Sequence, residues 1–146
     1  MNSRKLIGNA IIATAIGIVA VRLKKEKLIY IDKLPVIINE YIKAHFASRR
    51  ILKATQVRNG FKKTFNVFLD GKINLEFNNK AEIIEIEGNS KLPDSVIPDK
   101  ILDFVSSNYP DNVIIEWELE HKMQEVELDS GRELIFNLRG DFLFID

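Results

Sequence analysis

The sequence contains no cysteine and only two histidines among its 146 residues. Disulfide bonds, thiolate metal ligands and cysteine nucleophiles are therefore excluded. A metal site built from several histidines is also excluded within one chain, because His45 and His121 are the only ones available. The lack of cysteine does not by itself fix the compartment in which the protein works.

The chain also has no excess of charge of either sign, since 21 Lys and Arg residues balance 21 Asp and Glu residues. No overall field therefore draws it to nucleic acid or to an anionic membrane. The glycine-rich phosphate-binding patterns of nucleotide-binding proteins are missing, and so is the G-x-S-x-G pattern of serine hydrolases. We therefore expect no enzyme activity, no catalytic residues, no metal and no cofactor.

What the sequence does contain is one segment in two copies. Residues 128–146 alternate apolar and polar side chains and turn at Ser130-Gly131 and Arg139-Gly140, and residues 69–87 repeat this pattern. The matches at an offset of 59 are Leu75 with Leu134, Phe77 with Phe136, Asn78 with Asn137 and Ile83 with Phe142. Upstream the offset is 63, which places four extra residues of the first copy in its first hairpin, around residues 58–63.

Each copy is predicted to be one helix followed by about four antiparallel strands. Leu34-Pro35 and Ile97-Pro98 start the helices, because proline is tolerated in a first helical turn. A helix with one apolar stripe and a sheet with one apolar face must cover each other. The sequence therefore predicts an α+β fold in which two helices lie on one face of a continuous antiparallel sheet of about eight strands. The repeats span 32–88 and 94–146, and the other sheet face stays open.

Residues 1–27 form a separate segment at the start of the chain. Arg4 and Lys5 precede the uncharged run 6–21, and four basic residues follow it. This order is typical of a secretory signal or of a short membrane anchor, although a helix of that length covers only about 24 Å of a hydrocarbon core of about 30 Å. No small-x-small cleavage site precedes the basic residues. A cleaved signal, an uncleaved anchor and a buried element of the domain all remain open for this segment.

The second copy carries a set of motifs: Ile97-Pro98, Phe104-Val105, Tyr109-Pro110, Glu125-Val126-Glu127-Leu128, Ser130-Gly131, Glu133-Leu134 and Ile145-Asp146. In these motifs, and over about residues 32–146, the sequence resembles the PepSY-like, beta-lactamase-inhibitor-protein-like family of envelope proteins from Bacteroides-type bacteria. The resemblance implies tandem helix-plus-sheet units that are exported to the periplasm, with no established enzyme activity. The chain departs from the family pattern at Gln124, where an aromatic residue is usual, and at Ala47, which stands where the second copy has Pro110.

Glutamates alternate along two consecutive predicted strands. Glu116, Glu118 and Glu120 share one face of the first strand, and Glu125 and Glu127 share one face of the second. If these faces coincide, the carboxylates line one side of a hairpin. Three interpretations are a solvated sheet face, a surface for a basic partner and a Ca²⁺ site, of which the last lacks the loop spacing that Ca²⁺ sites use.

Trp117 alternates with these glutamates, so it faces the opposite side of its strand. It belongs to the core if that side faces the helices, and it is an anchor for a partner if that side is open. The candidate partner-binding residues are Glu116, Trp117, Glu118, Glu120, Glu125 and Glu127.

These observations predict a non-enzymatic module of the cell envelope that binds or inhibits a protein partner through its open sheet face. The alternative is a membrane-tethered structural or sensory domain that contacts the membrane through residues 6–21. The expected location is the periplasm or cell envelope, with membrane anchoring as the alternative. The partner is an unidentified envelope protein, and nucleic acid is not expected as a partner.

Overall fold

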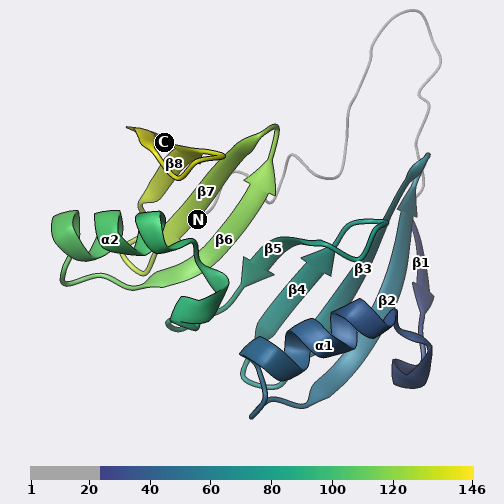
Figure 1. Ribbon diagram of the computed structural model, residues 1–146. Coiled ribbons are helices and arrows are strands. Elements are labelled where there is room, and N and C mark those ends of the chain that lie inside the picture. Colours follow the sequence, from purple (N-terminus) through teal and green to yellow (C-terminus); the bar gives the residue numbers. More distant parts are fainter. Residues whose placement is uncertain (1–23) are drawn as a thin grey trace, which may run out of the picture.

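The structure, a computed structural model, describes residues 24–146 (Figure 1). The interpretations of the apolar run 6–21 lie outside the described residues. Two helices lie on the same side of one antiparallel sheet, and the sheet runs through both halves of the chain (Figure 1). The predicted α+β fold is confirmed.

The sheet has nine strands: β1 (Lys25–Leu28), β2 (Ile51–Asn59), β3 (Lys62–Leu69), β4 (Ile73–Phe77), β5 (Ile83–Glu87), β6 (Ile114–Glu120), β7 (Met123–Leu128), β8 (Glu133–Asn137) and β9 (Phe142–Ile145). The helices are α1 (Val36–His45) and α2 (Asp99–Asn108), which follow the 3-10 turns η2 (Ile31–Lys33) and η3 (Asp94–Val96). The strands lie in the sheet in the order of the sequence, from β1 at one edge to β9 at the other. The strand beyond the predicted eight is β1, which adds to the edge of β2.

The two copies share one topology, a 3-10 turn, a helix and four antiparallel strands, as the repeat predicted. Their length difference lies in the first hairpin, because β2 and β3 have 9 and 8 residues whereas β6 and β7 have 7 and 6. Each strand of this hairpin is thus two residues longer in the first copy, which preserves the alternation of side chains between the faces. Arg58 and Asn59 therefore belong to β2, and the turn lies at Gly60 and Phe61.

Each helix begins directly after a proline in extended conformation, Pro35 before α1 and Pro98 before α2. The side chains buried against the sheet also correspond between the copies. They are Ile38 and Ile42 in α1, and Ile101 and Val105 in α2. The helices therefore present the same stripe to the same face of the sheet.

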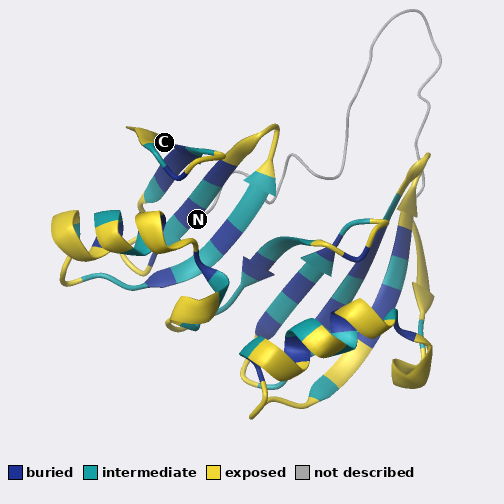
Figure 2. Ribbon diagram, in the orientation of Figure 1, coloured by how far each residue is buried: buried dark blue, intermediate teal, exposed yellow. Residues whose placement is uncertain are grey.

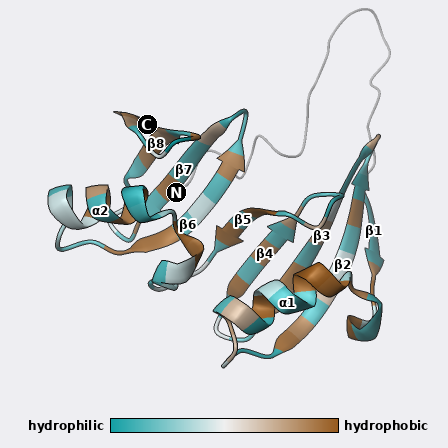
Figure 3. Ribbon diagram, viewed as in Figure 1, coloured by the Kyte–Doolittle hydropathy of each residue, from teal (hydrophilic) through white to brown (hydrophobic). Residues whose placement is uncertain are grey.

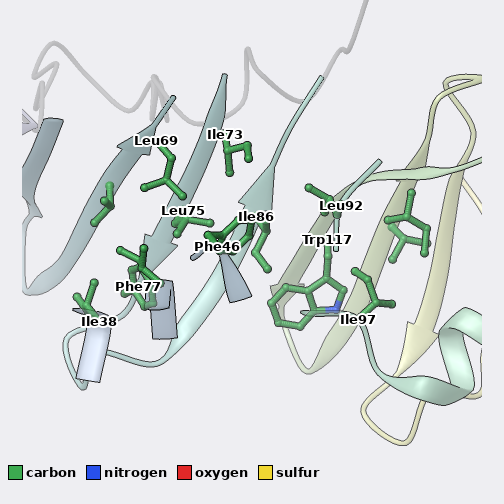
Figure 4. Packing of buried hydrophobic residues seen from close by; sticks show 14 of the residues in the cluster. Ile38, Phe46, Leu69, Ile73, Leu75, Phe77, Ile86, Leu92, Ile97 and Trp117 are labelled. Carbon is green, nitrogen blue, oxygen red and sulfur yellow. The ribbon is translucent and has the colours of Figure 1, made fainter. Parts of the chain in front are cut away.

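Buried residues alternate with more exposed ones along the strands (Figure 2), and the buried ones form one core with the helices. In β4 these are Ile73, Leu75 and Phe77, while Asn74 and Glu76 between them are only half-buried. The hydropathy of the strands alternates in the same bands (Figure 3). The core is continuous across the boundary between the copies, because Ile86 of β5 lies opposite Trp117 of β6 and both are buried (Figure 4).

The aromatic cluster of the second copy offers a test of these strand faces. Phe136 is fully buried and makes edge-to-face contacts with Phe104 and Phe142, at centroid distances of 5.4 and 5.8 Å. Phe136→Ala should lower the free energy of unfolding in urea by about 3–5 kcal/mol, as for other buried aromatic residues. Phe61→Ala, at a fully exposed hairpin turn, is the control and should change it by less than about 0.5 kcal/mol. A loss below about 1 kcal/mol for Phe136→Ala would mean that the faces of β8 are misassigned.

Candidate functional site

The face of the sheet opposite the helices, called the open face below, carries two rows of glutamates that cross neighbouring strands. In the first row, each residue lies opposite the next: Glu76, Glu85, Glu118 and Glu125, from β4 to β7. In the second row the order is Glu87, Glu116, Glu127 and Glu133, from β5 to β8. Eight carboxylates thus lie on five consecutive strands.

The glutamate rows form because side chains alternate along each strand. In β6, Glu116 and Glu118 flank Trp117, and in β7, Glu125 and Glu127 flank Val126, which is fully buried. Neighbouring strands are about 4.8 Å apart, so the carboxylates in each row are close neighbours. Like charges at directly opposite positions destabilise a sheet. The carboxylates that lie directly opposite each other within a row therefore repel one another.

The structure brings together four of the predicted site residues, Glu116, Glu118, Glu125 and Glu127. Glu120 lies on the same face at the exposed end of β6, opposite Met123 and 3.7 Å from the imidazole of His121. The sequence reasoning did not identify the remaining members of the rows, Glu76, Glu85, Glu87 and Glu133. The alternation of Glu85 and Glu87 around the apolar Ile86 is the sequence pattern that could have identified two of these four residues.

Trp117 lies on the helix-covered face and is only 7% exposed, so it is not part of the open face. Its Nε1–H donates a hydrogen bond to Oε1 of Gln124 at 3.1 Å. The Gln124 amide in turn donates to the carbonyl of Asn137 at 3.1 Å. The core interpretation of Trp117 is therefore right, and its proposed role as a partner anchor is wrong. Gln124, which departs from the family pattern, satisfies the indole N–H.

Glu116 lies in the second glutamate row between Glu87 of β5 and Glu127 of β7. Burial raises its pKa to about 8 from a usual 4.5, and the carboxylates of Glu85, Glu87, Glu127 and Glu118 add to the effect. Burial and the neighbouring carboxylates together therefore favour a proton on Glu116 near neutral pH. A cation bound at this face would lower the same repulsion.

Uncharged polar side chains continue both rows toward the first strands of the sheet. Thr55 and Asn66 lie opposite each other on β2 and β3, and Asn66 lies opposite Glu76. Asn74 lies opposite Glu87. Within residues 24–146, the Thr55 hydroxyl and the two Asn side-chain carbonyl oxygens are buried and have no hydrogen-bond partner. These buried polar atoms lie beside the glutamate rows on the same face of the sheet.

A hollow of about 270 Å³ adjoins the first row. Its lining includes Glu76, Glu85, Glu118 and Glu120, together with Lys62. In the described part of the chain, no group of three or more His, Asp or Glu side chains is arranged to hold a metal ion. The same part of the chain contains no helix long and apolar enough to cross a membrane.

A protein-family comparison matches the chain to a family described as "Putative beta-lactamase-inhibitor-like, PepSY-like", at residues 20–66 and 62–144. No curated protein matches the chain. Three similar solved structures come from Bacteroides species, and each supports the same fold.

The first is a "putative calcium-regulated periplasmic protein" of Bacteroides thetaiotaomicron, with 28% identity and a TM-score of 0.79, covering 83% of this chain and 96% of that one. The second, a "putative periplasmic protein" of Bacteroides vulgatus, has 30% identity and a TM-score of 0.78, with the same coverage. The third, a "putative periplasmic protein of unknown function" of Bacteroides vulgatus, has 30% identity and a TM-score of 0.78, covering 84% of this chain and 99% of that one.

The raised pKa of Glu116 predicts how stability depends on pH. Between about pH 4.5 and pH 8 the carboxyl ionises in the unfolded chain but keeps its proton in the folded one, so its contribution to stability falls as pH rises through this window. Glu116→Gln should remove this decline and stabilise the protein at pH 8 by about 1–2 kcal/mol, since solvent at the open face screens part of the effect.

Urea unfolding at pH 4.5 and pH 8 measures this difference. Glu120→Gln is the matched control, because Glu120 lies at the exposed end of the same strand. An unchanged pH dependence in Glu116→Gln would show that Glu116 ionises normally in the folded protein.

Proposed function

Because the chain belongs to the PepSY-like, beta-lactamase-inhibitor-like family, we propose that it is a non-enzymatic binding protein of the periplasm or cell envelope. Its open face binds a cationic partner protein. The observation that carries this proposal is the pair of glutamate rows, eight carboxylates on five consecutive strands, on the sheet face opposite both helices.

The physical basis of this binding is electrostatic complementarity. The five strands from β4 to β8 present the carboxylates over a width of about 20 Å, on a backbone fixed by the ladder of hydrogen bonds. An array of one sign of charge accelerates association with an oppositely charged surface and rejects partners of the same sign. The chain has no net charge, so the attraction comes from this local array of carboxylates and not from the molecule as a whole.

Hydrogen bonding adds specificity to the electrostatic attraction. Arginine side chains donate to carboxylates in a two-pronged geometry, and lysine side chains donate as compact point charges. The uncharged residues Thr55, Asn66 and Asn74 border the rows on the side of the first strands of the sheet. A partner with Lys and Arg side chains along an extended segment or a sheet face is therefore the best match.

The location rests on the relatives, which are described as periplasmic proteins. One of them is described as calcium-regulated. Carboxylate oxygens are the ligands that Ca²⁺ prefers, so Ca²⁺ would compete with a cationic partner for the same side chains. Calcium is therefore included in the binding experiment as a competitor.

Binding of a fluorescein-labelled decalysine peptide, followed by fluorescence anisotropy, tests the proposal. The wild-type chain should bind decalysine with an affinity that falls as salt is raised, and it should not bind decaglutamate. Glu118→Gln with Glu125→Gln, at directly opposite positions of β6 and β7, should weaken binding about tenfold, which corresponds to about 1.4 kcal/mol. Added Ca²⁺ should weaken binding to the wild-type chain more than an equal ionic strength of Na⁺ does.

The matched control removes two carboxylates from the helix-covered side. Glu40→Gln with Asp103→Asn, at exposed positions of α1 and α2, changes the net charge by the same amount and should leave the affinity unchanged. Equal losses in both double variants, or no binding of decalysine at low salt, would contradict the proposal.

A further inference from the structure

The last strand, β9, leaves an unprotected edge on the sheet. All four of its residues, Phe142, Leu143, Phe144 and Ile145, are apolar and exposed, and no described strand lies beyond it. The opposite edge strand, β1, contains Lys25, Glu26 and Lys27. Charged residues commonly protect edge strands from pairing with another chain, and β9 lacks this protection.

The first repeat shows what a strand of this kind pairs with. β5 corresponds to β9 at the offset of 59, so that Ile86 corresponds to Ile145. The outer edge of β5 pairs with β6, which places Ile86 opposite Trp117 and buries it completely. Ile145, which has no such neighbour, remains 53% exposed.

β1 pairs with the edge of β2 in the same way that β5 pairs with the edge of β6. At the repeat offset of 63, Thr55 of β2 corresponds to Glu118 of β6. Leu28 lies opposite Thr55, just as Glu85 lies opposite Glu118. The next residue, Ile29, donates its backbone N–H to the carbonyl of Ala54 at 2.9 Å. Three segments therefore correspond: Leu28-Ile29, Glu85-Ile86 and Phe144-Ile145.

β1 itself is held weakly at this position. It has only four residues, all exposed, and its ion pair between Glu26 and Lys53 is half-exposed at 3.4 Å. Exposed ion pairs contribute little to stability. An apolar groove of about 1080 Å³, lined in part by Leu28, Tyr30 and Leu52, lies beside it. The edge of β2 is therefore covered by a strand that a better match can displace.

We propose that β9 of one molecule pairs with β2 of a second molecule and displaces the β1 strand of that second molecule. This contact between two molecules has the same geometry as the β5–β6 contact that joins the two repeats within a single molecule. In this pairing Phe144 lies opposite Thr55 of the second copy, on the open face, and Ile145 faces its core near Ala54. The exchange removes charged side chains from the edge and buries apolar ones. The contact is head-to-tail, so it forms chains or closed rings. It is independent of partner binding by the glutamate rows.

Introduced cysteines test the register, because the chain has none of its own. Phe144→Cys is mixed with Thr55→Cys, and the mixture is oxidised and separated on a non-reducing gel. We expect a disulfide-linked dimer that contains one copy of each variant. Thr64→Cys replaces a second buried threonine, on the same face of the neighbouring strand β3, and should not cross-link to Phe144→Cys.

Two cross-linking results would overturn the proposal. One is a yield of cross-linked dimer from Phe144→Cys with Thr55→Cys that is no higher than the yield from Phe144→Cys with Thr64→Cys. The other is equally fast dimer formation by Phe144→Cys alone, which would indicate symmetric pairing of two β9 strands. Thermal melts followed by circular dichroism confirm that each variant is folded before oxidation.

Sedimentation velocity of the full chain gives an answer that does not depend on cysteine variants. The average mass of the wild-type protein should rise between about 10 and 500 μM, as mass action requires for a self-associating chain. Phe144→Lys should shift this rise to concentrations at least about tenfold higher, because a charge on the edge opposes pairing. Phe61→Lys, the same change at an exposed hairpin turn, should behave as wild type. A wild-type chain that stays monomeric over this range would overturn the proposal.

Discussion

The two helices cover one face of a sheet whose side chains alternate between two faces. This constraint determines whether each strand residue lies in the core or on the open face. On β6 and β7 the apolar Trp117 and Val126 lie in the core, so the glutamates beside them lie on the open face. The core and the glutamate rows are therefore two results of one pattern. Burial of the apolar side chains stabilises the fold, and the same alternation places the carboxylates side by side on the open face.

The second determinant is the pairing of β5 with β6, where Ile86 and Trp117 join the cores of the two repeats. Neither repeat closes its own sheet, because each ends in a strand whose outer edge can accept another. Within the chain, β6 accepts β5, and β1 covers the corresponding edge of β2. Only β9 is left without such a neighbour among the described residues. The duplication that built the fold thus also explains the apolar edge from which the self-association was inferred.

The family, the tandem topology and the helix positions could be predicted from the sequence, because local periodicity and proline placement encode them. The open face was predicted only in part. Glu85 and Glu118 are 33 residues apart in the sequence, and no local pattern indicates that β5 and β6 pair. For the same reason the sequence could not decide which face of the sheet Trp117 occupies, since that depends on which side of β6 the helices cover. β1 is mostly charged and has neither the alternation nor the apolar run of a strand, so the sequence did not predict a strand over Lys25–Leu28.

The central claim is that the two repeats form one cooperative core joined at Ile86 and Trp117. Trp117 is the only tryptophan of the chain, so its fluorescence reports on this junction, whereas far-ultraviolet circular dichroism reports on the helices and strands of both repeats. The most direct test follows both signals through urea unfolding of the full chain. The account predicts a single transition with the same midpoint and slope for both probes. A fluorescence transition at clearly lower urea than the circular dichroism transition would show that the repeats separate before they unfold, and it would contradict the claim.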